Sequence, residues 1–445
     1  MIAGPEAAGR QSFLAVDVRL ATAADKPAVL DFAARTWDGW DYIPEVWDEW
    51  LASADGIMLV ATPRDRGPGA GLELDLYGRS LEPGRPIGLC RVRMLSEDEA
   101  WMEGLRVAPG VRRRGVGTAL TAAALRWGLA QGATVARYAT GARNEGSHRL
   151  ATAFGFATLA GWRTYAEPEQ GDVDDAGAAE SAAFTGASDD SDAEPGVAPD
   201  RDVTPDEMDA RGALDGPSPD EPIELADEAA LHRALAATED AERAARERAV
   251  GDALAGRGLR VAAGTPDDVI GRWWSLVDHD PTFAAGDRLY EGRPWTFQRL
   301  SRERLAAHVR AGEVLAIDEP GATDRSGAAR EWALMILPAR RPWEDDDDPP
   351  SASLLAGTAS AALRLSETVQ DVAGGLRVRL PDPDPPVLRG WAARFADAGL
   401  VAHPEALHVF ELPLGATDAV EAALPAGALR YADPPVKRAV ATPIP

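Results

Sequence analysis

Residues 101–120 of the chain read W-M-E-G-L-R-V-A-P-G-V-R-R-R-G-V-G-T-A-L, an apolar strand, a turn, three arginines and two glycines. Apolar residues at helical spacing follow, which predicts a helix that begins near these glycines. Gly115 and Gly117 carry no Cβ, so backbone N–H groups can converge there on a ligand. The positive end of the helix dipole and the arginines at 112–114 add to that attraction. Together these features predict an anion site suited to a pyrophosphate.

The spacing Arg112-x-x-Gly115-x-Gly117 resembles the Arg/Gln-x-x-Gly-x-Gly/Ala signature of the GNAT acetyltransferase superfamily. Two later landmarks of that family, an asparagine and a Gly-Phe step, are matched by Asn144 and Phe154-Gly155-Phe156. The resemblance implies an α/β fold with a mixed sheet, the acyl-CoA N-acyltransferase fold, with acetyl-CoA as co-substrate and no metal. A dinucleotide-binding turn, the competing reading, needs a glycine where Leu120 stands.

The resemblance also assigns cofactor contacts. In this family, main-chain groups of the fourth strand pair with the pantetheine arm like an added strand. That role falls on Leu105 and Val107, with Arg106 between them. The remaining cofactor-binding residues implied are Arg112, Arg113, Arg114, Gly115, Val116, Gly117, Thr118 and Asn144.

Glu103 is the candidate catalytic residue, because many family members place a general-base glutamate two residues before the pantetheine-pairing position. Its alternative role is to attract a cationic substrate without taking a proton. The family's usual acid, a tyrosine seven residues after the asparagine, is replaced by Ala151. His148 and Tyr165 are candidate substitutes, and water or the departing thiolate itself could also serve.

The acceptor is expected to bind at the stretch T-W-D-G-W-D-Y-I-P-E-V-W-D-E-W-L, residues 36–51, which mixes aromatic and acidic side chains. Aromatic faces beside carboxylates suit a cationic amine. We take Trp37, Asp41 and Tyr42 as substrate-binding candidates. The alternative is that the tryptophans are core residues and the acids are solvated.

Two α/β units with the same order of elements are expected, with a helix at 145–154 that ends at Gly155 in the first and a helix at 353–372 in the second. They are a catalytic domain at 1–166 and a degenerate GNAT-like domain at 258–414, separated by an acidic disordered linker at 167–220 and a weakly packed helical segment at 221–257, with a tail at 415–445. The second unit lacks the signature and has five carboxylates at 344–348 where we expect its pyrophosphate loop, so it should not bind acetyl-CoA. Each unit is expected to fold alone.

The net charge of -26 comes from 72 acidic and 46 basic residues, of which Lys26 and Lys437 are the two lysines. Such a composition resembles that of a halophile's cytoplasmic protein, because salt screens surface repulsion; the alternative is a mesophile with an acidic linker. Too few lysines exist for a Walker A loop or a plausible Schiff base. The acidity argues against nucleic acid, and no apolar run predicts a membrane span or a secretory signal.

These observations lead to three hypotheses. The first is a cytoplasmic N-acetyltransferase that acetylates a primary amine of a small molecule, with a homodimer left open. The second is a protein acetyltransferase that acts on N-termini or lysines. The third is a CoA-responsive regulatory module without turnover, suggested by Ala151.

Overall fold

The computed structural model describes residues 13–36, 39–67, 73–168, 245–246, 248–317, 331–339, 349–382, 386–415 and 429–431. Residues 1–188 and 250–445 form one compact unit, and all contacts reported below lie within it. We call residues 13–168 its first half and residues 250–415 its second half. All but the first two residues of the predicted linker at 167–220 lie outside the described residues.

The first half is a strongly twisted sheet with helices on both faces. Strands β1 to β4 pair antiparallel in chain order, and β5 lies parallel to β4. The elements are β1 (Val16–Leu20), α1 (Lys26–Ala33), α2 (Ile43–Ala52), β2 (Gly56–Pro63), β3 (Gly88–Met94), β4 (Glu99–Val107), α3 (Val116–Gln131), β5 (Val135–Gly141), α4 (Glu145–Phe154) and β6 (Ala157–Ala166), with short 3-10 turns at Ala23–Asp25 and Pro109–Val111.

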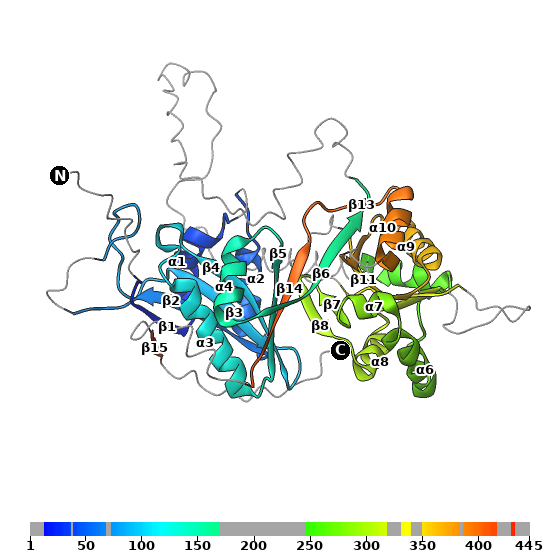
Figure 1. Ribbon diagram of the computed structural model, residues 1–445, viewed down its shortest axis with the longest axis horizontal. Helices are drawn as coiled ribbons and strands as arrows, with labels where there is room; N and C mark the ends of the chain where they lie inside the picture. Colours follow the sequence, from blue (N-terminus) through cyan, green and yellow to red (C-terminus); the bar gives the residue numbers. More distant parts are fainter. Residues whose placement is uncertain are drawn as a thin grey trace, which may run out of the picture. The chain divides into compact units, whose positions relative to one another are not determined.

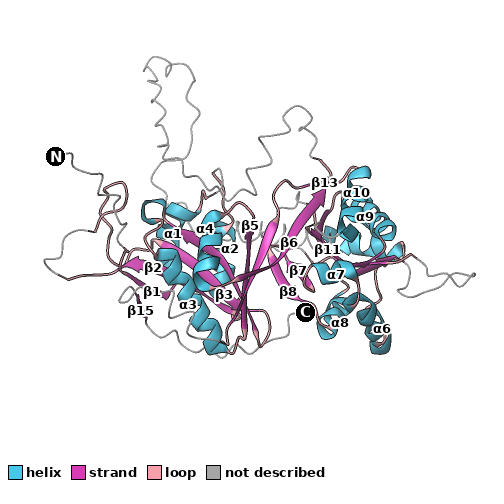
Figure 2. Ribbon diagram, in the orientation of Figure 1, coloured by secondary structure: helices cyan, strands magenta, loops and turns pink. Residues whose placement is uncertain are grey.

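Two apolar cores hold these helices to the sheet. On one face, α3 and α4 bury Leu120, Trp127 and Phe154 against β1 to β4, and Figure 2 shows both helices crossing the front of the strands. On the other face, α1 and α2 bury Val29 and Trp47 against β2 and β3. No described helix is long and apolar enough to cross a bilayer.

The second half repeats the order of strand, helix, parallel strand and helix. Here β11 and β12 pair in parallel, as β4 and β5 do. This confirms the predicted duplication of a mixed α/β fold. The elements are α6 (Asp267–Asp278), α7 (Pro281–Ala285), β7 (Leu289–Arg293), β8 (Thr296–Arg299), α8 (Arg302–Ala311), β9 (Val314–Ile317), β10 (Ala333–Ile336), β11 (Ser351–Gly357), α9 (Ala359–Ala373), β12 (Arg377–Pro381), α10 (Pro386–Asp397), β13 (Val401–Ala402) and β14 (Leu407–Pro413).

The two halves exchange strands. Their shared sheet runs in the order β15-β1-β2-β3-β4-β5-β14-β6-β12-β11-β10-β9, so β14 lies between β5 and β6 (Figure 1). The end of β6 pairs in turn with β12 and β13 of the second half. From the predicted tail, β15 (Leu429–Tyr431) adds a parallel strand to β1. The predicted units 1–166 and 258–414 therefore share hydrogen bonds that neither can form alone.

The second half differs from the prediction at the start of its long helix. The expected helix at 353–372 is strand β11 up to Gly357 and helix α9 thereafter. The counterpart of the first half's pyrophosphate loop is therefore the β11–α9 turn. The acidic run at 344–348 instead belongs to the connection between β10 and β11, which are antiparallel neighbours, and it lies outside the described residues.

That turn is capped by protein groups. The Gly357 N–H donates to Asp280 Oδ2 at 3.1 Å, and the Ala361 N–H donates to Thr358 Oγ1 at 3.3 Å. Helix α7 also packs against β11 and β12. Two backbone donors of the β11–α9 turn are thus bonded by protein groups, whereas no side chain caps the start of α3.

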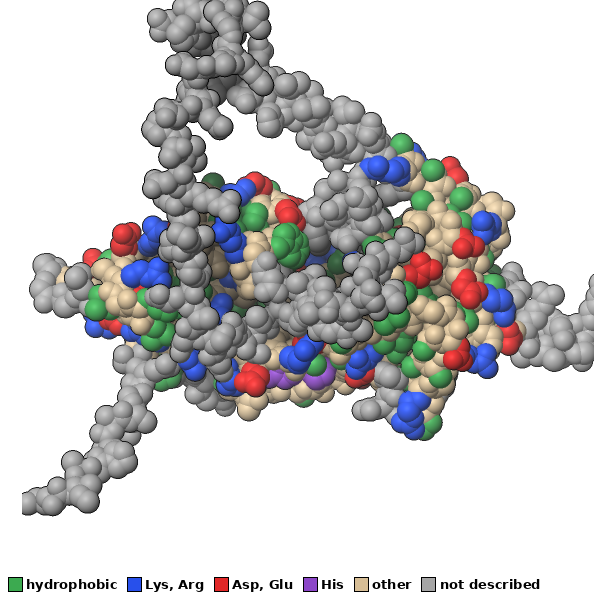
Figure 3. Space-filling view, turned by 90° about the horizontal axis from the view of Figure 1, so that it is seen from above, with side chains coloured by type: hydrophobic (Ala, Val, Ile, Leu, Met, Phe, Trp, Pro, Cys, Tyr) green, Lys and Arg blue, Asp and Glu red, His purple; other side chains and the backbone are tan. Residues whose placement is uncertain are grey.

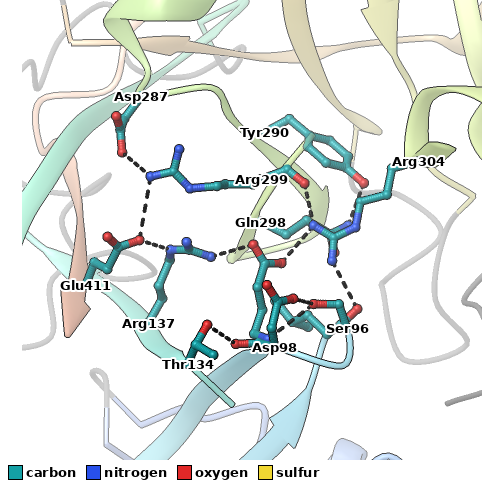
Figure 4. Close-up of polar contacts among 12 residues, drawn as sticks. Ser96, Asp98, Thr134, Arg137, Asp287, Tyr290, Gln298, Arg299, Arg304 and Glu411 are labelled. Carbon is teal, nitrogen blue, oxygen red and sulfur yellow. Dashed lines mark hydrogen bonds and ion pairs between the residues drawn. The ribbon is translucent and has the colours of Figure 1, made fainter. Parts of the chain in front are cut away.

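Buried ion pairs join the halves (Figure 4). Arg137 on β5 bonds Glu99 Oε1 at 2.9 Å and Glu411 Oε2 at 2.6 Å, so it links β4 to β14. Glu99 also lies 2.7 Å from Arg304 Nη1 of α8. Side chains of both halves thus neutralise one another at the junction.

The acidic excess is concentrated in one segment. Residues 169–244 hold 23 acidic and 4 basic residues, a net charge of -19 out of -26. On the face shown in Figure 3, basic and acidic side chains are interspersed over the described surface. This distribution favours the alternative of an acidic linker over a halophilic surface.

We therefore predict that the melting temperature depends weakly on KCl between about 0.1 and 3 M, because the folded halves carry little net repulsion for salt to screen. Scanning calorimetry across that range measures it. A steep rise in melting temperature with KCl would contradict this expectation and restore the halophile interpretation.

The strand exchange generates a second prediction. A fragment of residues 1–168 lacks β14 and leaves unpaired edges on β5 and β6, so we expect it to aggregate. Co-expression with residues 169–445 should return it to the soluble fraction as a complex. A monomeric, cooperatively unfolding 1–168 fragment in analytical ultracentrifugation and calorimetry would show that β14 is dispensable.

Candidate functional site

Strands β4 and β5 separate soon after they begin. They pair only at Glu99–Trp101 against Val135–Arg137. Beyond these residues β5 continues beside β14 up to Gly141, opposite Leu407. The edge of β4 that faces β5 therefore has no strand partner among the described residues after Trp101. Such an edge can hydrogen-bond an extended ligand, as the predicted pantetheine contact requires.

A bulge in β4 directs its side chains to two different faces. Leu89 lies opposite Arg106 and Arg91 opposite Glu103, so Cys90 faces two residues of β4. Gly104 sits in this bulge with φ 65°, and a Cβ there would lie 2.6 Å from Trp50 Cζ3. Both the backbone angle and the contact require glycine.

The pyrophosphate loop has the geometry of an anion site. Gly115 adopts a left-handed conformation with φ 86°, and no side chain caps the start of α3. The N–H groups of Val116, Gly117 and Thr118 therefore lack intrahelical acceptors. A Cβ on Gly117 would meet Leu150, Val107 and Leu105 at 3.5–4.0 Å, which places the helix start beside β4 and α4. These donors suit a pyrophosphate.

The three arginines of this loop do different things. Arg112 and Arg113 are exposed and can reach a phosphate. Arg114 is buried, and its guanidinium donates to Leu74 O and to Glu73 Oε1, each at 2.6 Å. Its side chain thus anchors the loop to the 73–81 segment, and Arg112 and Arg113 are the exposed arginines of the three.

Two further predicted cofactor contacts have protein partners for their side chains. Arg106 donates to Asp41 Oδ2 at 2.7 Å and lies opposite Leu89 of β3 in the β3–β4 pairing. Asn144 caps α4 by accepting from Ser147 N at 3.2 Å and donating to Thr140 Oγ1 at 3.0 Å. In this structure the Asn144 side chain therefore acts as the N-cap of α4.

Glu103 lies on the opposite side of β4 from Leu105 and Val107. Its Oε1 accepts from Arg91 Nη1 and lies 3.2 Å from Arg93 Nε. Both arginines are buried, whereas the Glu103 side chain is 17% exposed. Its Oε2 has no hydrogen-bond or ion-pair partner among the described residues. One oxygen is therefore fixed by the protein and the other is left for a ligand.

The predicted acceptor residues lie near this carboxylate with one exception. Trp37 lies outside the described residues. The carboxylate of Asp41 is buried and bonded to Arg106 and to Ile43 N, so its contacts are structural. Tyr42 packs edge-on against Trp50, with the Arg106 guanidinium over its ring. Burial raises the pKa of Tyr42 to about 12.

The candidates for the acid differ in their surroundings. Ala151 is buried on α4 and Tyr165 is buried against Phe395 in the core of the second half, away from the opening between β4 and β5. His148 lines an open depression of about 790 Å³ on the outer face of α4, where its Nε2 lies 3.2 Å from Gly141 O.

Tyr138 was missed by sequence reasoning. It lies on β5 just beyond the separation from β4 and donates to Ser147 O of α4 at 2.9 Å. Burial raises its pKa, which keeps the hydroxyl protonated. Tyr138 is noticeable only because it follows the last residue of β5 that pairs with β4. That pairing joins distant residues and could not be predicted from the sequence.

Cys90 is no acyl carrier in this geometry. Its thiol is buried in β3, and burial raises its pKa to about 12, so the nucleophilic thiolate is disfavoured. No group of three or more metal-ligating side chains occurs within the described ranges.

Comparison with known proteins identifies the fold's family. The acetyltransferase (GNAT) family model matches residues 47–156, from α2 through α4. The chain therefore contains a GNAT acetyltransferase domain, a member of a family that transfers acetyl groups from acetyl-CoA. A search of curated proteins gave no match.

Several solved structures are similar to the chain. A candidate acetyltransferase from Thermoplasma acidophilum has 10% identity and a TM-score of 0.41, with 89% of this chain and 99% of that one covered. A tandem GNAT protein from the clavulanic acid biosynthesis pathway has 12% identity and a TM-score of 0.36, with 89% of each chain covered. A GNAT acetyltransferase from Elizabethkingia anophelis, solved with acetyl-CoA bound, has 16% identity and a TM-score of 0.24, with 32% and 77% covered.

We predict that Gly117→Trp abolishes acetyl-CoA binding, because the indole would fill the space between α3 and β4. Gly117→Ala is the matched control and should bind normally, since its Cβ makes only ordinary contacts. Isothermal titration calorimetry decides this, with circular dichroism to verify the fold. Normal binding by the tryptophan variant would place the pyrophosphate elsewhere.

Proposed function

We propose that this protein transfers the acetyl group of acetyl-CoA to a primary amine of a small molecule. The observation that carries the proposal is the half-free carboxylate of Glu103. It stands at the β4 bulge, with the predicted anion site on the α3 side of the same strand and the aromatic residues Tyr42 and Trp50 on the α1–α2 side. One strand thus separates a place for the donor from a place for the amine.

The reaction needs a neutral amine beside the thioester. Glu103 Oε2 is the group positioned to accept a proton from the bound ammonium, while Arg91 and Arg93 hold Oε1. The amine nitrogen then forms a bond to the acetyl carbon, the carbon–sulfur bond breaks, and CoA leaves as the thiolate. The nitrogen releases its second proton to water, which leaves a neutral amide. No acyl-enzyme is required.

The departing thiolate is better protonated as it leaves. Tyr138 is our candidate donor, because its hydroxyl lies between β5 and α4. The proton would pass from Tyr138 Oη to the sulfur and be replaced from water. His148 and solvent stay as alternatives.

A protein N-terminus or lysine is the second candidate acceptor, since GNAT enzymes act on both kinds of amine. The aromatic and arginine contacts around Tyr42 support a small acceptor, because they fill the α1–α2 side with side chains. Incubation with acetyl-CoA and a panel of small amines, followed by mass spectrometry of products, tests the proposal. Acetylation of proteins but of no small amine would favour the second candidate, and binding without any product would favour a regulatory module.

We predict that Glu103→Gln lowers turnover by about 10²-fold, because the amide keeps the size but cannot accept the proton. Acetyl-CoA affinity should be unchanged, as the carboxylate lies on the other side of β4. Glu49→Gln, an exposed acid on α2, is the matched control. Initial rates at pH 6 to 9, with melting temperatures recorded for each variant, provide the measurement, and unaltered turnover would remove Glu103 from the mechanism.

A further inference from the structure

The second half reaches the charged cluster around Glu103. The β7–β8 hairpin brings Thr296 to β3, where its Oγ1 accepts a hydrogen bond of 3.1 Å from Arg93 Nη2. Thr296 and Arg93 are 3% and 2% exposed. A buried guanidinium of the first half is thus bonded by a hydroxyl of the second.

Arg93 depends on this hydroxyl for its orientation. Its Nε lies 3.2 Å from Glu103 Oε1 and its Nη1 lies 3.5 Å from Asp55 Oδ2. Neither nitrogen makes a hydrogen bond of good geometry in the part of the chain that the structure describes. Among the described residues, the bond to Thr296 is therefore the one directional contact that orients this guanidinium.

Arg91 provides the contrast. It bonds Glu103 Oε1, Ser53 Oγ at 3.1 Å and Asp55 Oδ1 at 2.9 Å, all within the first half. Arg91 is thus fixed without help from the second half. Of the two arginines that hold the catalytic carboxylate, only Arg93 has a bond across the junction.

The second half also fixes the strands that carry this cluster. Arg304 Nη2 donates to Leu95 O at 3.2 Å, at the turn between β3 and β4, and its Nη1 lies 2.7 Å from Glu99. Figure 4 shows Arg304 next to this turn, with Ser96 and Asp98 beside it. The β3–β4 hairpin is thus held by the second half at two places. Arg304 bonds the backbone of its turn, and Thr296 bonds Arg93 on β3.

We propose that Thr296 is a positioning residue for acetyl transfer, which orients Glu103 through Arg93. The inference rests on the proposed function of Glu103 and gives the second half a task in catalysis. The physical reason is that a buried guanidinium deprived of its acceptor must seek another. The nearest acceptors are Asp55 and Glu103 itself, so the arginine would shift toward the carboxylate that must remain available to the amine.

The test begins with Thr296→Val, which keeps the shape and removes the acceptor. We expect kcat to fall about tenfold, the effect of losing one hydrogen bond to a charged group, while KM and Kd for acetyl-CoA stay unchanged. Thr296→Ser should restore kcat. Thr368→Val, whose hydroxyl bonds only its own helix α9, is the matched control.

A double-mutant cycle with Glu103→Gln tests the relay. If Thr296 acts through Glu103, its replacement should lower kcat little further in the Glu103→Gln background. Additive effects, a failure of serine to rescue, or a change confined to KM for acetyl-CoA would each overturn the proposal.

The same double-mutant cycle can be measured with the free energy of unfolding in urea in place of kcat. This measurement does not depend on an acceptor being known. A non-zero coupling between positions 296 and 103, which make no direct bond, supports the relay, and strict additivity rejects it. If the unaltered protein acetylates none of the amines tested, the proposed function is wrong. The coupling between positions 296 and 103 can still be measured in that case.

Discussion

The pairing of β14 with β5 is the contact on which the rest of the structure depends. β5 shares only three residue pairs with β4 but seven with β14. Its backbone donors and acceptors are therefore satisfied on the side of β14, which lets β4 and β5 separate without leaving the sheet incomplete. The open edge of β4 that we propose for the pantetheine arm follows from this separation.

The junction of the halves is built from buried charges. Arg137 and Glu99 are buried and Glu411 is partly buried, and each charge has a partner from another strand. Such networks contribute little net stability after desolvation, yet a wrong pairing would leave an uncompensated charge, so they select one arrangement. The register of β14 is thereby specified by side chains as well as by backbone bonds.

The sequence predicted local features well and long-range ones poorly. The run at 112–117 and the helix end at Gly155 depend on neighbours in the chain, and the loop and α4 lie where they were predicted. The pairing of Arg114 with Glu73 and of Asp41 with Arg106 joins distant residues, so charge alone could not distinguish ligand-binding arginines from structural ones. The strand β11 was taken for helix because its alanines suit both, and the helix boundary depends on Gly357 and Thr358. The strand exchange could not be predicted, because the sequence of β14 has the pattern of an ordinary apolar strand and does not indicate which strands it pairs with.

The place of β14 also governs how the chain can fold as it is synthesised. The gap between β5 and β6 exists once residue 166 has emerged, but the strand that fills it ends at Pro413. At about 5–20 residues per second, roughly 12 to 50 s of translation separate the two events. Throughout that interval the nascent first half presents two open edges to its surroundings. The sheet around the proposed cofactor site is thus completed only when β14 has been made, even though the Arg-x-x-Gly-x-Gly signature lies in the first third of the chain.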